Sequence, residues 1–497
     1  MKLRELVKIC INKISEDIVK GFKIDGKNED LRYYTDIFDV NDFIQQKKFL
    51  ILGYKGTGKT YFAKKIQHIK EEEGNKVVNC NMEKFYTTLR KLEKKRIKDI
   101  RRELDMIWRF IVYIEIFKIV KNEKLNSEDR DIIRTINKFL NKNSFLLDLS
   151  SDKILKKIID EEIEVNTNFG VGIKKKIDML FGKKTKESSK KTVLKAEYFD
   201  FLDSLEEKIR NLLNNLGYGI SIFFDELDSK FRNTKNNRDI LLSLIEESSR
   251  INMEYDNFNI FICLRTEIFN LLNSSDLNKI LEDKSVTFKW NEEFLLKMLK
   301  KRLETSKMKD ENFFYFYFGN KNIQIKTRKK LKKIPVLSYI LHRTRYRPRD
   351  IIAFFKYLLK QDSSIPITKE RMDKESGYSN YLYNEVINEL VGFYSNEVIL
   401  IRFQMIEKFN KSTFRINEFF KEFKITNEKK DYLDFFQKLY DLNIINYIKN
   451  KNDHQKKFFN YNIDGSHILE ETHLIAINYG LRRQLKLYDP ADEKNVL

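Results

Sequence analysis

One stretch of the chain decides the fold: Gly53-Tyr54-Lys55-Gly56-Thr57-Gly58-Lys59-Thr60. It fits the pattern G-x-x-x-x-G-K-[ST] at every specified position. Glycines let the backbone curl so that its N–H groups point at one anion with no Cβ in the way. Lys59 adds a mobile positive charge, and the Thr60 hydroxyl is suited to hold magnesium. The pattern therefore predicts a phosphate-binding turn.

The flanking sequence supports this interpretation. The run 48–52 is short and apolar, as expected of a buried strand, and 61–73 has helical character. A helix that follows the turn presents its N-terminus to the same anion. A chance glycine-rich turn is a poor alternative when both neighbours fit. The residues expected to contact nucleotide are Gly53, Tyr54, Lys55, Gly56, Thr57, Gly58, Lys59, Thr60 and Tyr61.

A second element carries the acids that such a site needs. The apolar run 220–224 ends in Asp225-Glu226-Leu227-Asp228. Ligands bind at the carboxyl ends of strands in open α/β sheets. We expect Asp225 to hold magnesium and Glu226 to polarise the attacking water as general base. An acidic turn is common in isolation, but with a phosphate-binding turn upstream this becomes the minority interpretation.

The chain repeats a strand–turn–helix order. Further strand-like runs lie at 74–79 and 259–264, and 237–250 has helical period. Such an order requires a parallel sheet with crossover helices. The predicted fold class is an α/β P-loop NTPase core of three layers. It carries a helical insertion at about 84–215, a helical lid and a C-terminal winged-helix-like domain.

Composition limits the classes of protein that remain. The chain has 497 residues, 41% hydrophobic and 34% charged, which is ordinary for a folded protein. Its three cysteines (Cys10, Cys80 and Cys263) lie far apart, which favours a reducing compartment and neither a zinc site nor a disulfide framework. No uncharged apolar run reaches the length of a membrane span. We expect a cytoplasmic protein that does not enter a membrane.

Basic charge is concentrated in one segment. Residues 300–360 hold 18 Lys and Arg against four acids, within a net charge of +21 for the chain. Such a field attracts nucleic acid through counterion release. The alternative is that abundant Lys, Asn and Ile reflect an AT-rich genome. Nucleic-acid contact by 300–360 is the favoured hypothesis.

The C-terminal part has the element order of a winged helix. Helix-like stretches at 381–409, 415–423 and 432–442 precede strand-like runs at 444–448 and 458–463, which flank the basic turn 449–457. The third helix carries Asp434 and Asp441 with Asp431 before it, so it is a poor reader of a DNA groove. Phosphate or protein contact is favoured over sequence-specific recognition, and winged helices also serve as plain protein-contact modules.

These motifs resemble those of AAA+ and STAND-type ATPases. The Asp225-Glu226 pair is the hydrolytic form of Walker B in that superfamily. The segment 260–269 is similar to a sensor-1 strand of prokaryotic P-loop ATPases. The segment 345–350 resembles the sensor-2 motif of the lid, usually Gly-Asn-Pro-Arg-Asp in origin-recognition-type members. The resemblance covers about 30–80 and 215–360.

The resemblance implies roles for particular residues. Arg349 corresponds to the sensor-2 arginine, but Tyr346-Arg347 replaces Gly-Asn, so Arg347 competes with it. Arg265 or Thr266 would fill the sensor-1 position, where the family usually has Asn, Ser or Thr. The implied catalytic set is Glu226, Lys59, Arg349, Arg347 and Arg265, with ATP and Mg²⁺ as cofactors. Arg232, Arg238 and Arg250 are unranked candidates for an arginine finger.

The predicted organisation has four parts. They are an N-terminal helix and connector (1–45), an ATPase core (46–290), a helical lid (291–375) and the winged-helix-like domain (376–497). The implied function is Mg-dependent ATP hydrolysis that drives conformational change or assembly, in a bacterial antiphage defence or DNA-transaction system. A homo-oligomer with a separate protein effector is expected. The alternative is a nucleotide-gated oligomeric scaffold that recruits an effector without DNA. No nuclease, deaminase or protease constellation occurs.

Overall fold

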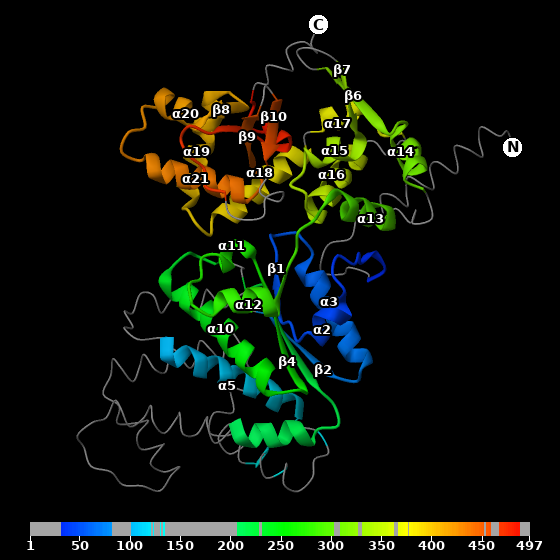
Figure 1. Ribbon diagram of the computed structural model, residues 1–497, viewed down its shortest axis with the longest axis vertical. Coiled ribbons are helices and arrows are strands. Elements are labelled where there is room, and N and C mark those ends of the chain that lie inside the picture. The colour runs from blue at the N-terminus through cyan, green and yellow to red at the C-terminus, as the bar shows by residue number, and fades with distance from the viewer. Residues whose placement is uncertain are drawn as a thin grey trace, which may run out of the picture. The chain divides into compact units, whose positions relative to one another are not determined.

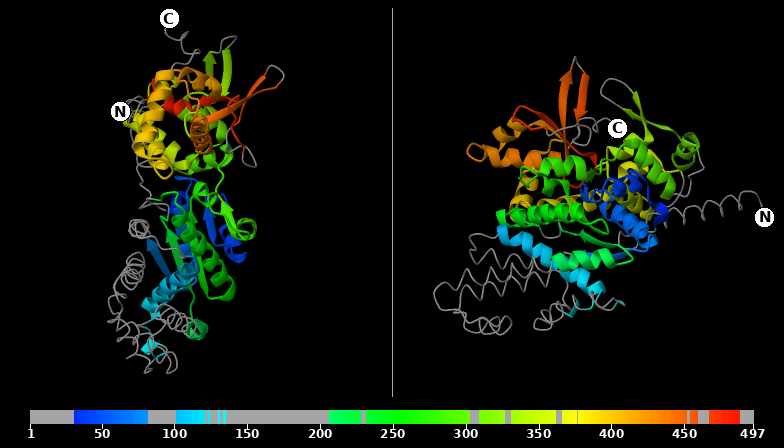
Figure 2. Two further views of the ribbon diagram at one scale, coloured as in Figure 1. Left: turned by 90° about the vertical axis from the view of Figure 1, so that its left-hand side faces the viewer. Right: turned by 60° about the horizontal axis from the view of Figure 1, so that its bottom comes forward.

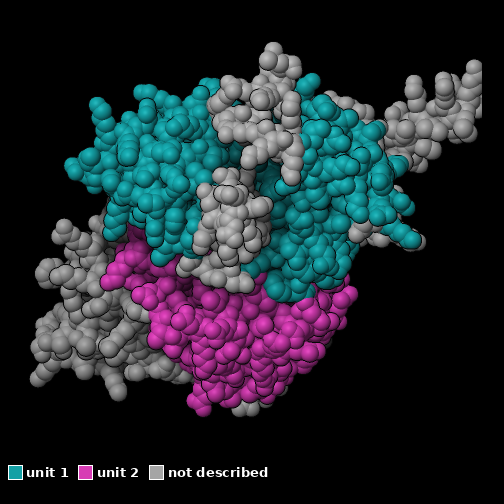
Figure 3. Space-filling view, turned by 45° about the horizontal axis from the view of Figure 1, so that its top comes forward, with its two compact units in different colours: residues 1–38, 53–61, 288–497 teal, residues 39–52, 62–287 magenta. Residues whose placement is uncertain are grey.

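The computed structural model divides the described residues between two compact units. It describes residues 31–81, 101–120, 206–227, 231–302, 309–326, 331–361, 366–375, 377–451, 454–458 and 467–487, with isolated positions between 123 and 134. Unit 1 comprises 1–38, 53–61 and 288–497, and unit 2 comprises 39–52 and 62–287 (Figure 3). The expected N-terminal helix, most of the insertion and Asp228 lie outside the described residues.

Unit 2 is built on a five-stranded parallel sheet. Its order is β2 (Lys76–Asn81), β3 (Ile220–Asp225), β4 (Phe258–Leu264), β1 (Leu50–Leu52) and β5 (Ser285–Thr287). The prediction of an α/β core with a parallel sheet is confirmed. The fifth strand was not predicted. β4 lies between β1 and β3 in the sheet. The carboxyl end of β4 therefore lies between the carboxyl ends of the two strands that carry the motifs.

Helices cover both faces of this sheet, which gives three layers (Figure 1). Phe223 and Phe261 pair across β3 and β4 and stack with centroids 4.7 Å apart. On that face α2 (Val40–Gln45) places Phe43 against Phe261, and Phe43 also meets Phe62 of α3 (Lys59–Glu72). Because successive strand residues face opposite sides, Phe224 meets Trp108 on the other face.

That second face is covered by α10 (Lys235–Glu254), with α5 (Arg101–Val120) packed beside it. The Trp108 indole donates to the Ile240 carbonyl at 3.1 Å. Asn252 makes two hydrogen bonds with the backbone of Ile260, which ties α10 to β4. α11 (Thr266–Phe269) and α12 (Leu277–Lys284) then lead to β5. The described part of the insertion is therefore a packed layer of the core.

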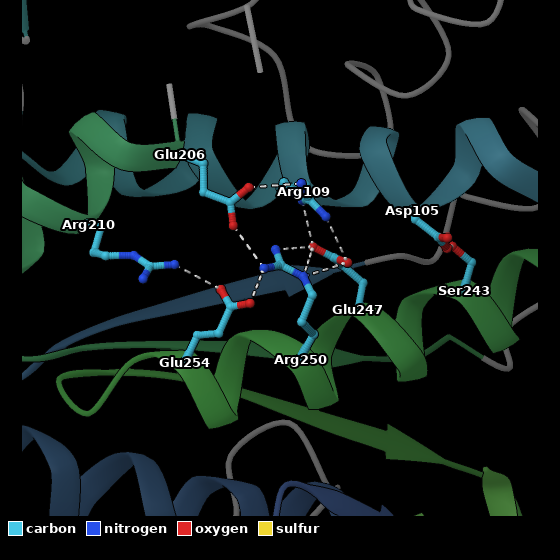
Figure 4. Close-up of polar contacts among 8 residues, drawn as sticks. All are labelled: Asp105, Arg109, Glu206, Arg210, Ser243, Glu247, Arg250 and Glu254. Atoms are coloured by element: carbon cyan, nitrogen blue, oxygen red, sulfur yellow. Dashed lines mark hydrogen bonds and ion pairs between the residues drawn. The ribbon is translucent and has the colours of Figure 1, made fainter. Parts of the chain in front are cut away.

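Ion pairs join α5 to α10 and to the helical residues 206–215 (Figure 4). Arg109 contacts Glu206 at 2.8 Å and Glu247 at 2.9 Å. Arg250 contacts Glu206, Glu247 and Glu254 at 2.5–2.8 Å. Its guanidinium is thus engaged within its own chain, which argues against Arg250 as an arginine finger. The network holds the described part of the insertion on the core.

Unit 1 contains the helices expected of a lid and one hairpin that was not expected. The helices are α13 (Glu292–Arg302), α14 (Asp310–Phe318), α15 (Val336–Leu341), α16 (Pro348–Gln361), α17 (Lys369–Lys374) and α18 (Gly377–Leu390). The lid was predicted to be helical, and that prediction is wrong at β6 (Asn322–Lys326) and β7 (Leu331–Pro335), which form an antiparallel hairpin. Lys332 and Lys333 are both exposed on it, and since adjacent residues of a strand face opposite sides, both sides of the ribbon reach water there.

The remaining elements of unit 1 form a module that we call the winged-helix module, residues 396–477. They are α19 (Asn396–Phe409), β8 (Thr413–Arg415), α20 (Ile416–Glu422), α21 (Lys429–Asp441), β9 (Ile445–Lys451), β10 (His454–Phe458) and β11 (Leu474–Ile477). The sheet order is β10-β9-β11-β8. The β9–β10 hairpin extends away from the helices of its unit in both views of Figure 2.

Two details of the C-terminal prediction are corrected. The helix expected over 381–409 is two helices, because the Ser395 side chain accepts from the Val398 amide and starts α19 afresh. The basic segment 449–457 is largely strand, since β9 extends to Lys451 and β10 begins at His454. The short helix α22 (Tyr479–Arg482) follows β11. In the described residues no helix is long and apolar enough to cross a membrane.

We expect Glu247→Gln to destabilise the protein by about 3–5 kcal/mol, the usual cost of breaking a buried ion pair. Burial raises the pKa of the Glu247 carboxyl, but hydrogen bonds from Arg250 and Arg109 outweigh it and hold that pKa below 4.5. A lowered pKa gives stability that is present above pH 4.5 and is lost as pH falls through the folded-state value.

Thermal unfolding from pH 7 to pH 3 checks this. Wild type should lose stability on acidification more steeply than Glu247→Gln, whereas the exposed-site control Glu282→Gln should follow wild type. Equal slopes for wild type and Glu247→Gln would contradict the assignment.

Candidate nucleotide site

The turn between β1 and α3 needs its glycines because of their backbone angles and because neighbouring atoms leave no space for a Cβ. Gly56 and Gly58 have φ of +80° and +100°, which L side chains rarely adopt. A Cβ at Gly53 would lie 2.5 Å from Thr57 Oγ1 and 2.9 Å from Phe288 Cβ. A Cβ at Gly56 would lie 2.7 Å from Arg349 Cβ. The backbone therefore forms a cradle that side chains would fill, which fits a phosphate-binding loop.

Three successive carbonyls of this loop are held by groups of the lid. The Lys55 carbonyl accepts from Arg347 Nη1 at 3.1 Å, the Gly56 carbonyl from the Arg349 amide at 3.3 Å, and the Thr57 carbonyl from Trp290 Nε1 at 2.8 Å. In a planar trans peptide the N–H points opposite to the C=O. Holding these carbonyls outward turns the amides of residues 56–58 the other way.

Lys59 and Thr60 begin α3 directly after the loop. The Lys59 ammonium donates to the carbonyls of Gly53 at 2.8 Å and Tyr54 at 3.2 Å, so it lies across the loop. Thr60 is exposed. Tyr61 is buried, with its ring 5.4 Å from that of Tyr34 in an edge contact. Its position indicates packing of the connector rather than a phosphate contact.

The acidic pair lies at the carboxyl end of β3, in unit 2. The Asp225 carboxylate accepts from the Glu226 amide at 2.8 Å. Glu226 has φ of +58°, a left-handed conformation that is uncommon outside glycine. Such outliers cluster at functional sites, since the surrounding structure must hold them. Neither acid is fully buried.

The segment after β4 holds both residues proposed for sensor 1. Arg265 is the N-cap of α11 but makes no capping bond through its side chain. Thr266 Oγ1 is buried, with no hydrogen-bond partner in the described part of the chain. A buried hydroxyl at this edge, of the residue type the resemblance expects, makes Thr266 the better candidate of the two.

The three arginines before α16 and at its start have different environments. Arg345 is buried, with Nε 2.7 Å from Asp350 and Nη1 3.0 Å from Glu389. Burial lowers the pKa of Arg345, but the charges of Asp350 and Glu389 outweigh it and raise that pKa well above its ordinary value. Arg347 is also buried, whereas Arg349 is exposed beside Gly56. Arg349 is therefore better placed than Arg347 to meet a phosphate.

Sequence reasoning gave no contact with the loop to Trp290 or to the acids of α18. Trp290 is one of two tryptophans in the chain and stands just before α13. Glu385 contacts Lys55 at 2.9 Å, and Glu389 contacts Arg347 at 3.0 Å. The i,i+4 spacing of the two glutamates indicates one helix face, but nothing local indicates that this face meets the loop.

Comparisons with known proteins bear on the fold and on one segment. Residues 293–386 match the family model described as FunZ-associated C-terminal helical domain. Among solved structures, the Orc1 protein of Aeropyrum pernix in complex with DNA is similar at 11% identity and a TM-score of 0.33, covering 90% of this chain and 88% of that one. Cdc6p of Pyrobaculum aerophilum is similar at 10% identity and 0.29, covering 95% and 99%. No curated protein sequence matches.

The left-handed backbone at Glu226 gives a prediction about stability. Glu226→Gly should be more stable than Glu226→Ala by about 1 kcal/mol, since only glycine relieves the strain of a positive φ. Thermal or urea unfolding of the two variants, which both lack the carboxylate, checks it. Equal stabilities, or a more stable alanine variant, would contradict the left-handed assignment.

Proposed function

We propose that this chain is a magnesium-dependent ATPase. The observation that carries the proposal is the loop 53–60, whose glycines are required by backbone angle and by space and whose carbonyls are held outward. Such a loop presents several amides to one anion. Lys59 stands across it, and the exposed Arg349 stands beside Gly56. Two cations next to an amide cradle suit a polyphosphate.

The residues have distinct tasks in this proposal. Lys59 neutralises charge on the β- and γ-phosphates, and Arg349 adds charge from the lid. Thr60 and Asp225 are the residues suited to hold Mg²⁺, which when bound neutralises charge on the phosphate oxygens. Glu226 takes a proton from the attacking water. Thr266 orients that water or the terminal phosphate from the end of β4.

Nucleic acid is the partner that we propose for the exposed lysines of unit 1. Two arginines of the basic segment serve the interior, since Arg345 and Arg347 pair with buried acids, and Arg343 pairs with Asp373 nearer the surface. The hairpin lysines Lys332 and Lys333 remain exposed. They supply the charge that a phosphate backbone needs.

The β9–β10 hairpin supports the same partner. Lys449 lies directly opposite Lys456 in the strand register. The sequence places Lys449, Lys451, Lys456 and Lys457 on this hairpin, and such a concentration of positive charge attracts a phosphate backbone. The acids of α21 make that helix a poor reader of a DNA groove, so phosphate contact by the lysines of the hairpin is favoured over sequence-specific recognition.

The alternative function is a nucleotide-gated scaffold whose partner is another protein. Its support is the acidic character of α21, which carries Asp431, Asp434 and Asp441. These acids repel DNA and can pair with basic groups of a protein partner. A place in antiphage defence follows from the resemblance alone and stays a prediction, as do homo-oligomerisation and a separate effector. The two functions differ in whether DNA changes the rate of hydrolysis.

The proposed chemistry predicts separable defects. Glu226→Gln should bind ATP but hydrolyse it more slowly by a factor on the order of 10² to 10⁴, the usual contribution of a general base. Lys59→Ala should lose nucleotide binding. Fluorescent-nucleotide binding and phosphate release measure the two properties. Normal turnover in Glu226→Gln would show that the base is another residue.

Double-stranded DNA should stimulate hydrolysis, and the stimulation should fade as salt rises. The double variant Lys332→Glu/Lys333→Glu should weaken DNA binding and reduce the salt slope by about 1 for each phosphate that the lysines neutralise. Lys235→Glu/Lys279→Glu changes the charge equally at exposed sites of unit 2 and is the matched control. A rate indifferent to DNA would favour the scaffold.

A further inference from the structure

We propose that Arg347 is a positioning residue that couples the nucleotide state of the phosphate-binding loop to the C-terminal end of α21. It would thereby act on the winged-helix module. The inference rests on the proposed function, because it requires nucleotide at loop 53–60. It removes Arg347 from the residues expected to touch phosphate and gives it a different task.

Arg347 touches three parts of unit 1 at once. Its Nη1 donates to the Lys55 carbonyl at 3.1 Å and pairs with Glu389 of α18 at 3.0 Å. Its Nη2 donates to the Leu442 carbonyl, at the C-cap of α21, at 3.1 Å. The guanidinium also lies 5.0 Å from the centre of the Tyr54 ring. With 2% of the residue exposed, both terminal nitrogens are engaged inside the protein.

The hydrogen bond from Arg347 to the Lys55 carbonyl links Arg347 to the loop through a single rigid peptide group. The Lys55 carbonyl and the Gly56 amide belong to the same planar peptide. A phosphate that binds the Gly56 amide therefore changes the direction or the polarisation of the carbonyl that Arg347 holds. Gly56 permits such a rotation, since its own φ is +80° and it has no side chain to obstruct the turn.

A second contact strengthens the link between the loop and α18. The Lys55 ammonium pairs with Glu385 at 2.9 Å, one helical turn before Glu389. Both ends of Lys55, its carbonyl through Arg347 and its ammonium, are thus tied to α18. Movement of the loop is transmitted to a packed helix instead of being absorbed by a flexible side chain.

At the other end, the Leu442 carbonyl lies where α21 gives way to β9. The Leu442 amide donates to Lys438, and the Ile444 amide donates to Leu439 at 2.8 Å. Ile444 in turn accepts from the Asn478 amide, which follows β11. A change at Leu442 therefore reaches the end of α21 and two strands of the module through consecutive hydrogen bonds.

Hydrogen–deuterium exchange of the full-length protein tests the coupling. Samples with and without saturating ADP or a non-hydrolysable ATP analogue are compared at two segments, the loop and residues 438–446. In wild type, nucleotide should protect the loop and change exchange of 438–446 several-fold. In Arg347→Gln and in Glu389→Gln the loop should still be protected at saturation, while the response of 438–446 falls at least fivefold.

Arg343→Gln is the matched control, because it removes a neighbouring guanidinium that pairs with Asp373 and the Tyr339 carbonyl and has no place in the proposed nucleotide site; its response at 438–446 should persist. Full responses in both Arg347→Gln and Glu389→Gln, or a wild type whose loop is protected while 438–446 does not respond, would overturn the coupling. If Arg347→Gln does not fold, wild type and Glu389→Gln decide the question. A wild-type loop that nucleotide never protects would overturn the proposed function, and the coupling with it.

Discussion

Three peptide carbonyls of the phosphate-binding loop accept hydrogen bonds from the lid, and the geometry of the loop depends on them. When a loop aims several amides at one anion, the carbonyls of the same peptides point the other way and need hydrogen-bond donors. A buried carbonyl without a donor costs free energy of folding. Here a guanidinium, a helix N-terminal amide and an indole take one each. The donors come from the lid rather than from the sheet, so the lid helps to form the loop that it also covers.

The buried carboxylate of Glu389 explains why two arginines stand so close together before α16. Its side chain has no exposed surface, and an unpaired charge there would be strongly destabilising. Arg345 and Arg347 both pair with it, and Asp350 balances the second positive charge. The two positive charges and two negative charges of this cluster therefore balance. The start of α16 is thereby fixed to α18, which in turn fixes where Arg349 leaves the backbone beside Gly56.

The sequence predicted what depends on neighbours along the chain. The loop, the acidic pair and four strands are local patterns, and each was found within a residue or two of its bounds. β5 has only three residues, too few for a pattern. The β6–β7 hairpin was missed because β7 is mostly exposed and its sequence, Leu-Lys-Lys-Ile-Pro, has no alternation of apolar and polar residues. The role proposed for Arg347 needed partners 42, 95 and 292 residues away, which no spacing rule indicates.

The backbone at Tyr346 is left-handed. Its φ is +56°, a conformation that glycine adopts without strain and that other residues adopt rarely. The tyrosine ring is 8% exposed and packs in the core of unit 1, and its hydroxyl lies 3.4 Å from Glu292 of α13. Burial of an aromatic ring offsets a backbone cost of about 1–3 kcal/mol. The turn at this residue is what sends Arg347 inward to Glu389 while Arg349, two residues later, faces solvent at the loop. Tyr346 thus makes the backbone turn and also ties it to α13, the helix that follows Trp290.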